Sequence, residues 1–117
     1  MDNIKGQDIN IMNAKYEKVV AHLATLGADK TFSIGFCWGV WYAFKLSAKY
    51  GKFTAIAGPH PSLQVEEWFG GNQVELTNSI TCPAFFLPAG NDLPNVKDNG
   101  ELVKLLADKY PNQTGTV

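Results

Sequence analysis

The residues best suited to chemistry lie in the segment Gly35-Phe36-Cys37-Trp38-Gly39, where a cysteine stands between two glycines. The pattern Gly-x-nucleophile-x-Gly is typical of a sharp turn between a strand and a helix, which exposes the nucleophile at the end of a sheet. The N-terminus of a following helix would favour the thiolate of Cys37. In this geometry the backbone N–H of Trp38 is the expected oxyanion donor. We therefore predict a nucleophile at Cys37, with Gly35 and Gly39 present because larger residues would clash in the turn.

A buried cysteine in an ordinary strand-to-helix turn is the alternative interpretation, because Gly-x-Cys-x-Gly alone is a weak pattern. The second cysteine, Cys82, precedes Pro83 at the expected start of a strand and is interpreted as a small buried hydrophobe. Cys37 is therefore expected to react with thiol reagents faster than Cys82. A redox-sensing role for Cys37 is weaker, because no resolving cysteine lies near it in the sequence.

Helices and strands that alternate along the chain would position Cys37. The expected elements are helices over 13–26, 38–50 and 97–109, a helical turn at 64–69, and strands over 31–36, 53–58 and 83–88. Strands that alternate with helices are typical of right-handed βαβ units and of a parallel sheet. The predicted fold class is therefore α/β, with a parallel sheet core of about three strands flanked by helices. The tail 110–117 is interpreted as the approach to a last strand that does not follow.

The composition fits one small globular domain over residues 1–117. Of the 117 residues, 45% are hydrophobic and 18% are charged, and the formal net charge is -1. This charge gives no basic surface for nucleic acid, and no apolar run is long enough to span a membrane. The polar start of the chain has no signal sequence, which favours a cytoplasmic location; an organellar location stays open if the N-terminus is truncated. Cysteine and histidine spacings indicate neither a disulfide framework nor a metal site.

Three segments of the chain resemble the dienelactone hydrolase (carboxymethylenebutenolidase) family of the α/β-hydrolase superfamily. They are the elbow Ile34-Gly-Phe-Cys-Trp-Gly39, the tripeptide His60-Pro61-Ser62, and the run Pro83 to Asp92. The resemblance covers residues 31 to about 110. It implies a partial α/β-hydrolase fold, with Cys37 in the nucleophile elbow.

The resemblance also implies a Cys-His-Asp triad that opens a lactone or a small ester without a cofactor or a metal. Cys37 matches the nucleophile, and Asp92 matches the acid that would orient the histidine. The alternative for Asp92 is a structural turn aspartate. Asp98 is the nearest rival, but we interpret it as a residue of the first turn of the following helix.

The chain departs from the family pattern in its histidines. The triad histidine is expected after the acid, yet no histidine follows Asp92, and the two histidines are His22 and His60. His22 is expected to be solvated on a helix. His60 lies in the wrong order for a general base; together with Phe36 it could line the pocket, although a loop histidine with local hydrogen bonds is the favoured interpretation. The chain thus resembles an internal fragment, truncated at both ends relative to the family.

Two functions from different classes follow. The first is a cysteine hydrolase of a lactone or small carboxylic ester that acts through a thioester and is weak or inactive because the triad histidine is missing. The second is a non-catalytic remnant of the fold that serves as a structural or interaction subunit of a larger assembly. In both cases a short parallel sheet leaves its edges open, so association with another chain or with a copy of itself is expected.

Overall fold

The computed structural model describes residues 9–112 and the backbone of residues 115–116. In chain order the elements are α2 (Ile9–Thr25), β1 (Thr31–Ile34), α3 (Trp38–Tyr50), β2 (Phe53–Pro59), α4 (Val65–Trp68), α5 (Gln73–Ser79), β3 (Ala84–Leu87), the 3-10 helix η1 (Pro94–Val96), α6 (Glu101–Lys109) and β4 (Gly115–Thr116). Among these described residues, no helix is long and apolar enough to cross a membrane.

The strands form one parallel sheet in the order β1-β2-β3-β4. Ile34 of β1 lies opposite Ala57 of β2, which in turn lies opposite Phe85 of β3. Each strand therefore runs beside the next with a crossover that contains helix, which confirms the predicted parallel α/β fold.

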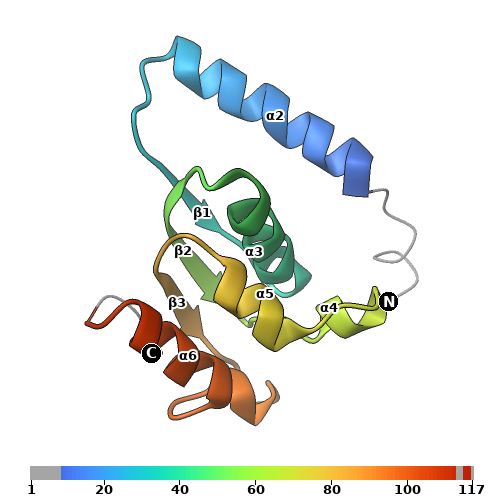
Figure 1. Ribbon diagram of the computed structural model, residues 1–117, viewed down its shortest axis with the longest axis vertical. Coiled ribbons are helices and arrows are strands. Elements are labelled where there is room, and N and C mark those ends of the chain that lie inside the picture. The colour runs from blue at the N-terminus through green and yellow to red at the C-terminus, as the bar shows by residue number, and fades with distance from the viewer. Residues whose placement is uncertain (1–8, 113–114, 117) are drawn as a thin grey trace.

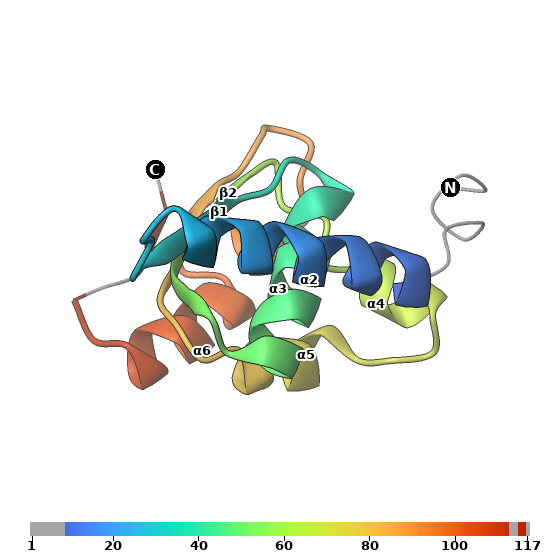
Figure 2. The ribbon, with the colours of Figure 1, turned by 90° about the horizontal axis from the view of Figure 1, so that it is seen from above.

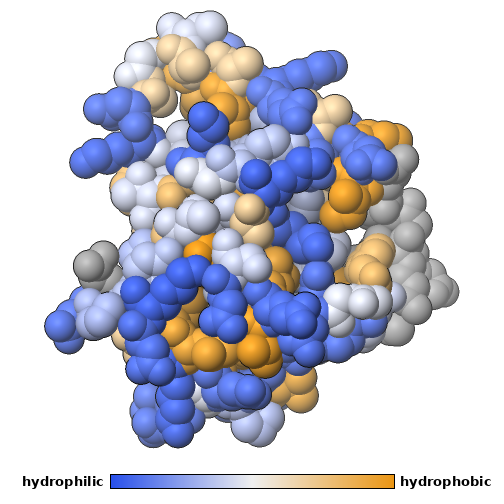
Figure 3. Space-filling view, in the orientation of Figure 1, coloured by the Kyte–Doolittle hydropathy of each residue, from blue (hydrophilic) through white to orange (hydrophobic). Residues whose placement is uncertain are grey.

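Helices α3, α5 and α6 lie together on one side of this sheet (Figure 1), and the view from above shows the same arrangement (Figure 2). Their apolar side chains meet alternate side chains of the strands in a core that includes Val40, Trp41, Phe44, Ile56, Leu76, Phe86, Leu102 and Leu106. The surface over these helices is largely hydrophilic, with smaller hydrophobic patches (Figure 3). This side of the sheet thus holds the core that fixes the elements around Cys37.

The opposite side of the sheet exposes apolar side chains. Phe32 and Ile34 of β1 are 65% and 67% exposed, and Phe85 and Leu87 of β3 are 39% and 38% exposed. The register places these four side chains on one face with Ala57 between them. Parallel sheets are usually covered on both faces, so this apolar sheet face is a surface that association would bury.

Helix α2 is set off from the rest of the molecule (Figure 1) and buries only Asn13. Two tyrosines of α3 hold it: Tyr42 Oη donates to Asn13 Oδ1 at 2.9 Å, and Tyr50 Oη donates to Glu17 Oε1 at 2.8 Å. The bond to Glu17 raises the pKa of Tyr50 to about 12, with desolvation a smaller cause. The attachment of α2 therefore depends mainly on a few polar and aromatic contacts, with Ile9 packed against the edge of the core.

Several predicted boundaries differ from the structure. The first helix begins at Ile9, four residues before position 13, and β1 ends at Ile34 rather than at position 36. Gly35 and Phe36 leave the strand because they belong to the turn that carries Cys37. The predicted helix over 38–50 and the helical turn within 64–69 are confirmed as α3 and α4, and the strand over 53–58 extends by one residue to Pro59.

The C-terminal third holds larger differences. Helix α5 was not predicted, although Asn72 caps it by accepting hydrogen bonds from Val74 N and Glu75 N. The helix predicted over 97–109 begins only at Glu101, because residues 94–96 form η1 and a turn follows. The interpretation of Asp98 as a helix residue is therefore wrong, since it lies in this turn.

The tail prediction needs a similar correction. Gly115 and Thr116 form the short strand β4, which pairs in parallel with Phe85 and Phe86 of β3. A strand after β3 is therefore present among the described residues. Residues 113, 114 and 117 of the predicted tail, and residues 1–8, lie outside the described residues.

We expect the isolated chain to associate through the apolar sheet face. Replacing Phe32 and Ile34 together by serine removes two large exposed apolar side chains, so the double variant should shift toward the monomer in size-exclusion chromatography with light scattering. Leu26→Ser, at a residue that is 69% exposed just beyond α2, is the matched control and should leave the mass unchanged. A monomeric wild-type chain with a cooperative melt would contradict this expectation.

Candidate functional site

Cys37 occupies the turn between β1 and α3 in a backbone conformation that few non-glycine residues adopt. Its φ is 55° and its ψ is -122°, and its side chain is exposed. Such strain costs on the order of 1–3 kcal/mol and persists only where the surroundings enforce it. The predicted strand-to-helix elbow is thus present, with the cysteine at its apex.

Backbone hydrogen bonds from the end of β2 and from the loop that follows it hold Cys37 on both sides. The N–H of Cys37 donates to the carbonyl oxygen of Pro59 at 3.2 Å, and the N–H of Ser62 donates to the carbonyl oxygen of Cys37 at 3.2 Å. The segment 59–62, at the end of β2 and just after it, therefore holds both peptide groups of the cysteine. This is the loop that contains His60.

The two elbow glycines have different roles. A Cβ on Gly35 would collide with the backbone of Gly39 and with the backbone nitrogen of Val40. A Cβ on Gly39 would meet nothing within 4 Å. The expectation that both positions must be small is therefore supported for Gly35 only, where the strand end touches the first turn of α3.

The backbone N–H of Trp38 begins α3. The next two N–H groups fold back onto the turn, since Gly39 N donates to Phe36 O at 2.8 Å and Val40 N donates to Cys37 O at 3.1 Å. In the described part of the chain the N–H of Trp38 has no such acceptor, as is usual for the first donor of a helix. The N–H of Trp38 can therefore donate to a ligand beside Cys37, at the position where an oxyanion donor is expected.

Asp92 follows β3, and its carboxylate is buried, with the side chain 4% exposed. The backbone N–H of Ala89 donates to Asp92 Oδ2 at 2.7 Å, and Asp92 N donates back to Ala89 O at 3.0 Å. These bonds fix the carboxylate and leave Oδ1 for another partner. That partner is His60, whose Nδ1 lies 2.8 Å from Asp92 Oδ1.

His60 follows β2 directly and adopts a φ of 51°. Its backbone N–H donates to Leu87 O at 2.9 Å, so backbone and side chain both contact the segment around β3. The Nδ1 atom is buried and close enough to Asp92 for an ion pair, although the ring N–H is not aligned for a hydrogen bond. The contacts of this histidine are therefore long-range, not local as the sequence led us to expect.

The remaining predicted residues lie outside this group. Phe36 is 66% exposed beside the elbow, and His22 is exposed on α2. Cys82 is 2% exposed, as predicted for a buried hydrophobe. Among the described residues, no three His, Cys, Asp or Glu side chains gather closely enough to hold a metal ion.

A buried carboxylate elsewhere in the fold was missed by sequence reasoning. Glu66 of α4 accepts hydrogen bonds from Trp41 Nε1 at 2.5 Å and from Lys45 Nζ at 3.0 Å. Both donors lie on α3, so the contact joins α4 to the helix that begins at the elbow. Trp41 is thus part of the core.

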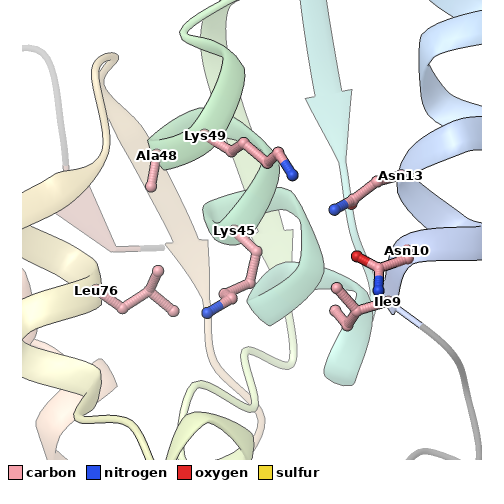
Figure 4. A pocket seen from close by; sticks show the side chains of 7 residues that line it. All are labelled: Ile9, Asn10, Asn13, Lys45, Ala48, Lys49 and Leu76. Carbon is pink, nitrogen blue, oxygen red and sulfur yellow. The ribbon is translucent and has the colours of Figure 1, made fainter.

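A cavity of about 320 Å³ lies away from the elbow (Figure 4). It opens between α2, α3 and α5 and is lined by Ile9, Asn10, Asn13, Lys45, Ala48, Lys49 and Leu76. Neither Cys37 nor Asp92 borders it. The candidate site is therefore the open end of the sheet at positions 37, 60 and 92, not this cavity.

The different surroundings of Gly35 and Gly39 predict opposite effects of the same substitution. Gly35→Ala should lower the free energy of unfolding by about 3 kcal/mol, because its Cβ meets backbone that cannot move aside. Gly39→Ala, within α3, should change it little or raise it by up to about 1 kcal/mol, because alanine favours the helix. Chemical denaturation of the two variants compares them, and equal losses would contradict the assigned contact.

The two thiols should differ in their rate of alkylation. Cys37 is exposed, whereas burial raises the pKa of the Cys82 thiol, and the hydrogen bond to Ser47 and the charge of Lys109 oppose this only in part. Near neutral pH, iodoacetamide should label Cys37 at least about tenfold faster than Cys82, and the labelling of Cys82 should rise as the pH increases. Mass spectrometry of the digested protein measures both rates. Denaturant should remove the difference, and equal rates in the folded protein would contradict the prediction.

Comparison with known proteins agrees with this geometry. The family model described as "Dienelactone hydrolase family" matches residues 1–113 of the chain. No curated protein and no solved structure gives a significant match. The match spans nearly the whole sequence and includes the elbow, the loop after β2 and the acid-bearing loop after β3, and so the chain belongs to the dienelactone hydrolase family.

Proposed function

We propose that this member of a hydrolase family acts on a lactone or a small carboxylic ester, with Cys37 as the nucleophile. The observation that carries the proposal is the conformation of Cys37, whose exposed side chain stands on a strained turn at the carboxyl end of β1. Open parallel sheets bind ligands at this end of their strands. A strained non-glycine residue held by hydrogen bonds from a neighbouring loop is typical of a functional site.

The reaction follows from the groups around the sulfur. The thiolate of Cys37 attacks the carbonyl carbon of the ester, and the negative charge that develops on the carbonyl oxygen is stabilised by the N–H of Trp38. The alcohol part then leaves, and an acyl thioester remains on Cys37. Water hydrolyses this thioester and releases the acid.

Asp92 is proposed as the acid of the site. Its buried carboxylate is fixed by Ala89 and lies against the imidazole of His60. No histidine follows Asp92 in the 117 residues, and the ring N–H of His60 is not aligned for a hydrogen bond to the carboxylate. Because no aligned hydrogen bond from an imidazole to this carboxylate is present, we expect turnover to be weak, since a well-placed base contributes roughly 10²–10⁴-fold.

A non-catalytic role of the same fold is the second candidate. The apolar sheet face favours it, because an interaction subunit of a larger assembly would bury such a surface. A contact partner, either a copy of this chain or another protein, is compatible with both functions. Reactivity at Cys37 separates them, since a remnant needs no reactive thiol.

An activated ester distinguishes the two functions. With p-nitrophenyl acetate, the wild-type chain should release a burst of about one nitrophenolate per chain and carry an acetyl group on Cys37, with steady turnover well below the roughly 10 s⁻¹ of an ordinary enzyme. Cys37→Ser should lose the thioester adduct, and Cys82→Ser should keep it. Stopped-flow absorbance and peptide mass spectrometry measure these quantities. Acetylation of Cys37 no faster than that of a free thiol would instead support the non-catalytic remnant.

A further inference from the structure

We propose that His60 is the general base that activates Cys37, in partnership with Asp92. This inference rests on the proposed function and names the proton acceptor of that same site. It assigns the role to a histidine that precedes the acid in the chain, not to one that follows it.

The first observation is the contact between His60 and Asp92. The two atoms His60 Nδ1 and Asp92 Oδ1 are 2.8 Å apart, and the carboxylate is buried. Nδ1 is itself buried, whereas the His60 side chain as a whole is 38% exposed, so the exposed area belongs to the rest of the side chain. A carboxylate this close to Nδ1 limits how the ring can turn, which leaves Nε2 as the ring nitrogen that can exchange protons.

The second observation is the position of His60 beside the nucleophile. The carbonyl group that accepts the hydrogen bond from Cys37 N belongs to the peptide bond between Pro59 and His60. Two residues further on, Ser62 N donates to Cys37 O. His60 therefore lies within the short loop that is bonded to Cys37 on both sides.

The third observation is the backbone of the two residues. Cys37 and His60 both have positive φ values, 55° and 51°, at the carboxyl ends of the adjacent strands β1 and β2. Asp92 follows β3, the next strand of the sheet. Three consecutive strands thus deliver a thiol, an imidazole and a carboxylate to one end of the sheet, and two of these residues are held in costly conformations.

The order of the three residues along the chain is no obstacle. Nucleophile, base and acid occur in different chain orders in unrelated hydrolases, because the reaction requires only their arrangement in space. A loop at the end of β2 can deliver an imidazole to the same end of the sheet as any later loop.

The proton transfers balance in both halves of the reaction. His60 Nε2 takes the proton from Cys37 Sγ as the sulfur attacks the ester carbonyl, and returns it to the alkoxide, which leaves as the alcohol. In the second half, His60 takes a proton from water as the hydroxide attacks the thioester, and returns it to the thiolate of Cys37. Ester and water are consumed, and acid and alcohol are formed.

The test compares the acylation rates of four proteins with p-nitrophenyl acetate over a range of pH. His60→Asn removes the imidazole but keeps a residue that tolerates positive φ, so the fold should survive. It should slow the burst by about 10²-fold or more, and the limb of the pH–rate profile that depends on the imidazole should disappear. Asp92→Asn should also slow the burst, and His22→Asn, at the other histidine, should match the wild type.

Added imidazole provides a second readout that a structural role would not affect. It should restore part of the burst rate of His60→Asn and none of that of Cys37→Ser. If His60→Asn acylates as fast as the wild type while Cys37→Ser does not react, the proposed function stands and the role of His60 is overturned. If the wild type does not acylate at Cys37, both are overturned. If His60→Asn is slow but imidazole does not restore it, His60 is not the base.

Discussion

The close approach of Gly35 to the first turn of α3 is the constraint on which the site depends. Because Gly35 has no Cβ, the end of β1 can touch the backbone of Gly39, and Cys37 is left at the apex of a very tight turn. The strain at Cys37, on the order of 1–3 kcal/mol, is outweighed by the burial that α3 achieves, since Val40 and Phe44 are fully buried and each contributes about 2 kcal/mol.

The same turn determines where the loop after β2 lies. With Cys37 at the apex, its N–H donates to the carbonyl oxygen of Pro59 and its carbonyl oxygen accepts from the N–H of Ser62. His60 is therefore held at the end of β2, from which its ring reaches Asp92. The absence of a Cβ at Gly35 thus positions the proposed nucleophile, Cys37, directly and His60 indirectly.

Features with a local physical cause could be predicted from the sequence. The end of α3 is an example, because Gly51 adopts a φ of 64° that glycine tolerates and its N–H closes the helix onto Ser47 O. The elbow was predicted for the same reason, since a glycine pattern between an apolar strand and an amphipathic helix is a local signal.

Features that depend on distant partners could not be predicted. The start of α6 at Glu101 follows from η1 and the turn after it, and β4 exists because it pairs with β3. The contact of His60 with Asp92 joins loops that are 32 residues apart, and only the register of β2 beside β3 brings them together.

The two sides of the sheet also separate the two possible functions. The elbow helix α3 packs into the core on the covered side, whereas the residues expected to drive association, such as Phe32, lie on the opposite face. A partner on the apolar sheet face would therefore stabilise β1 without displacing α3, so catalysis at Cys37 and assembly through the sheet are compatible in one molecule.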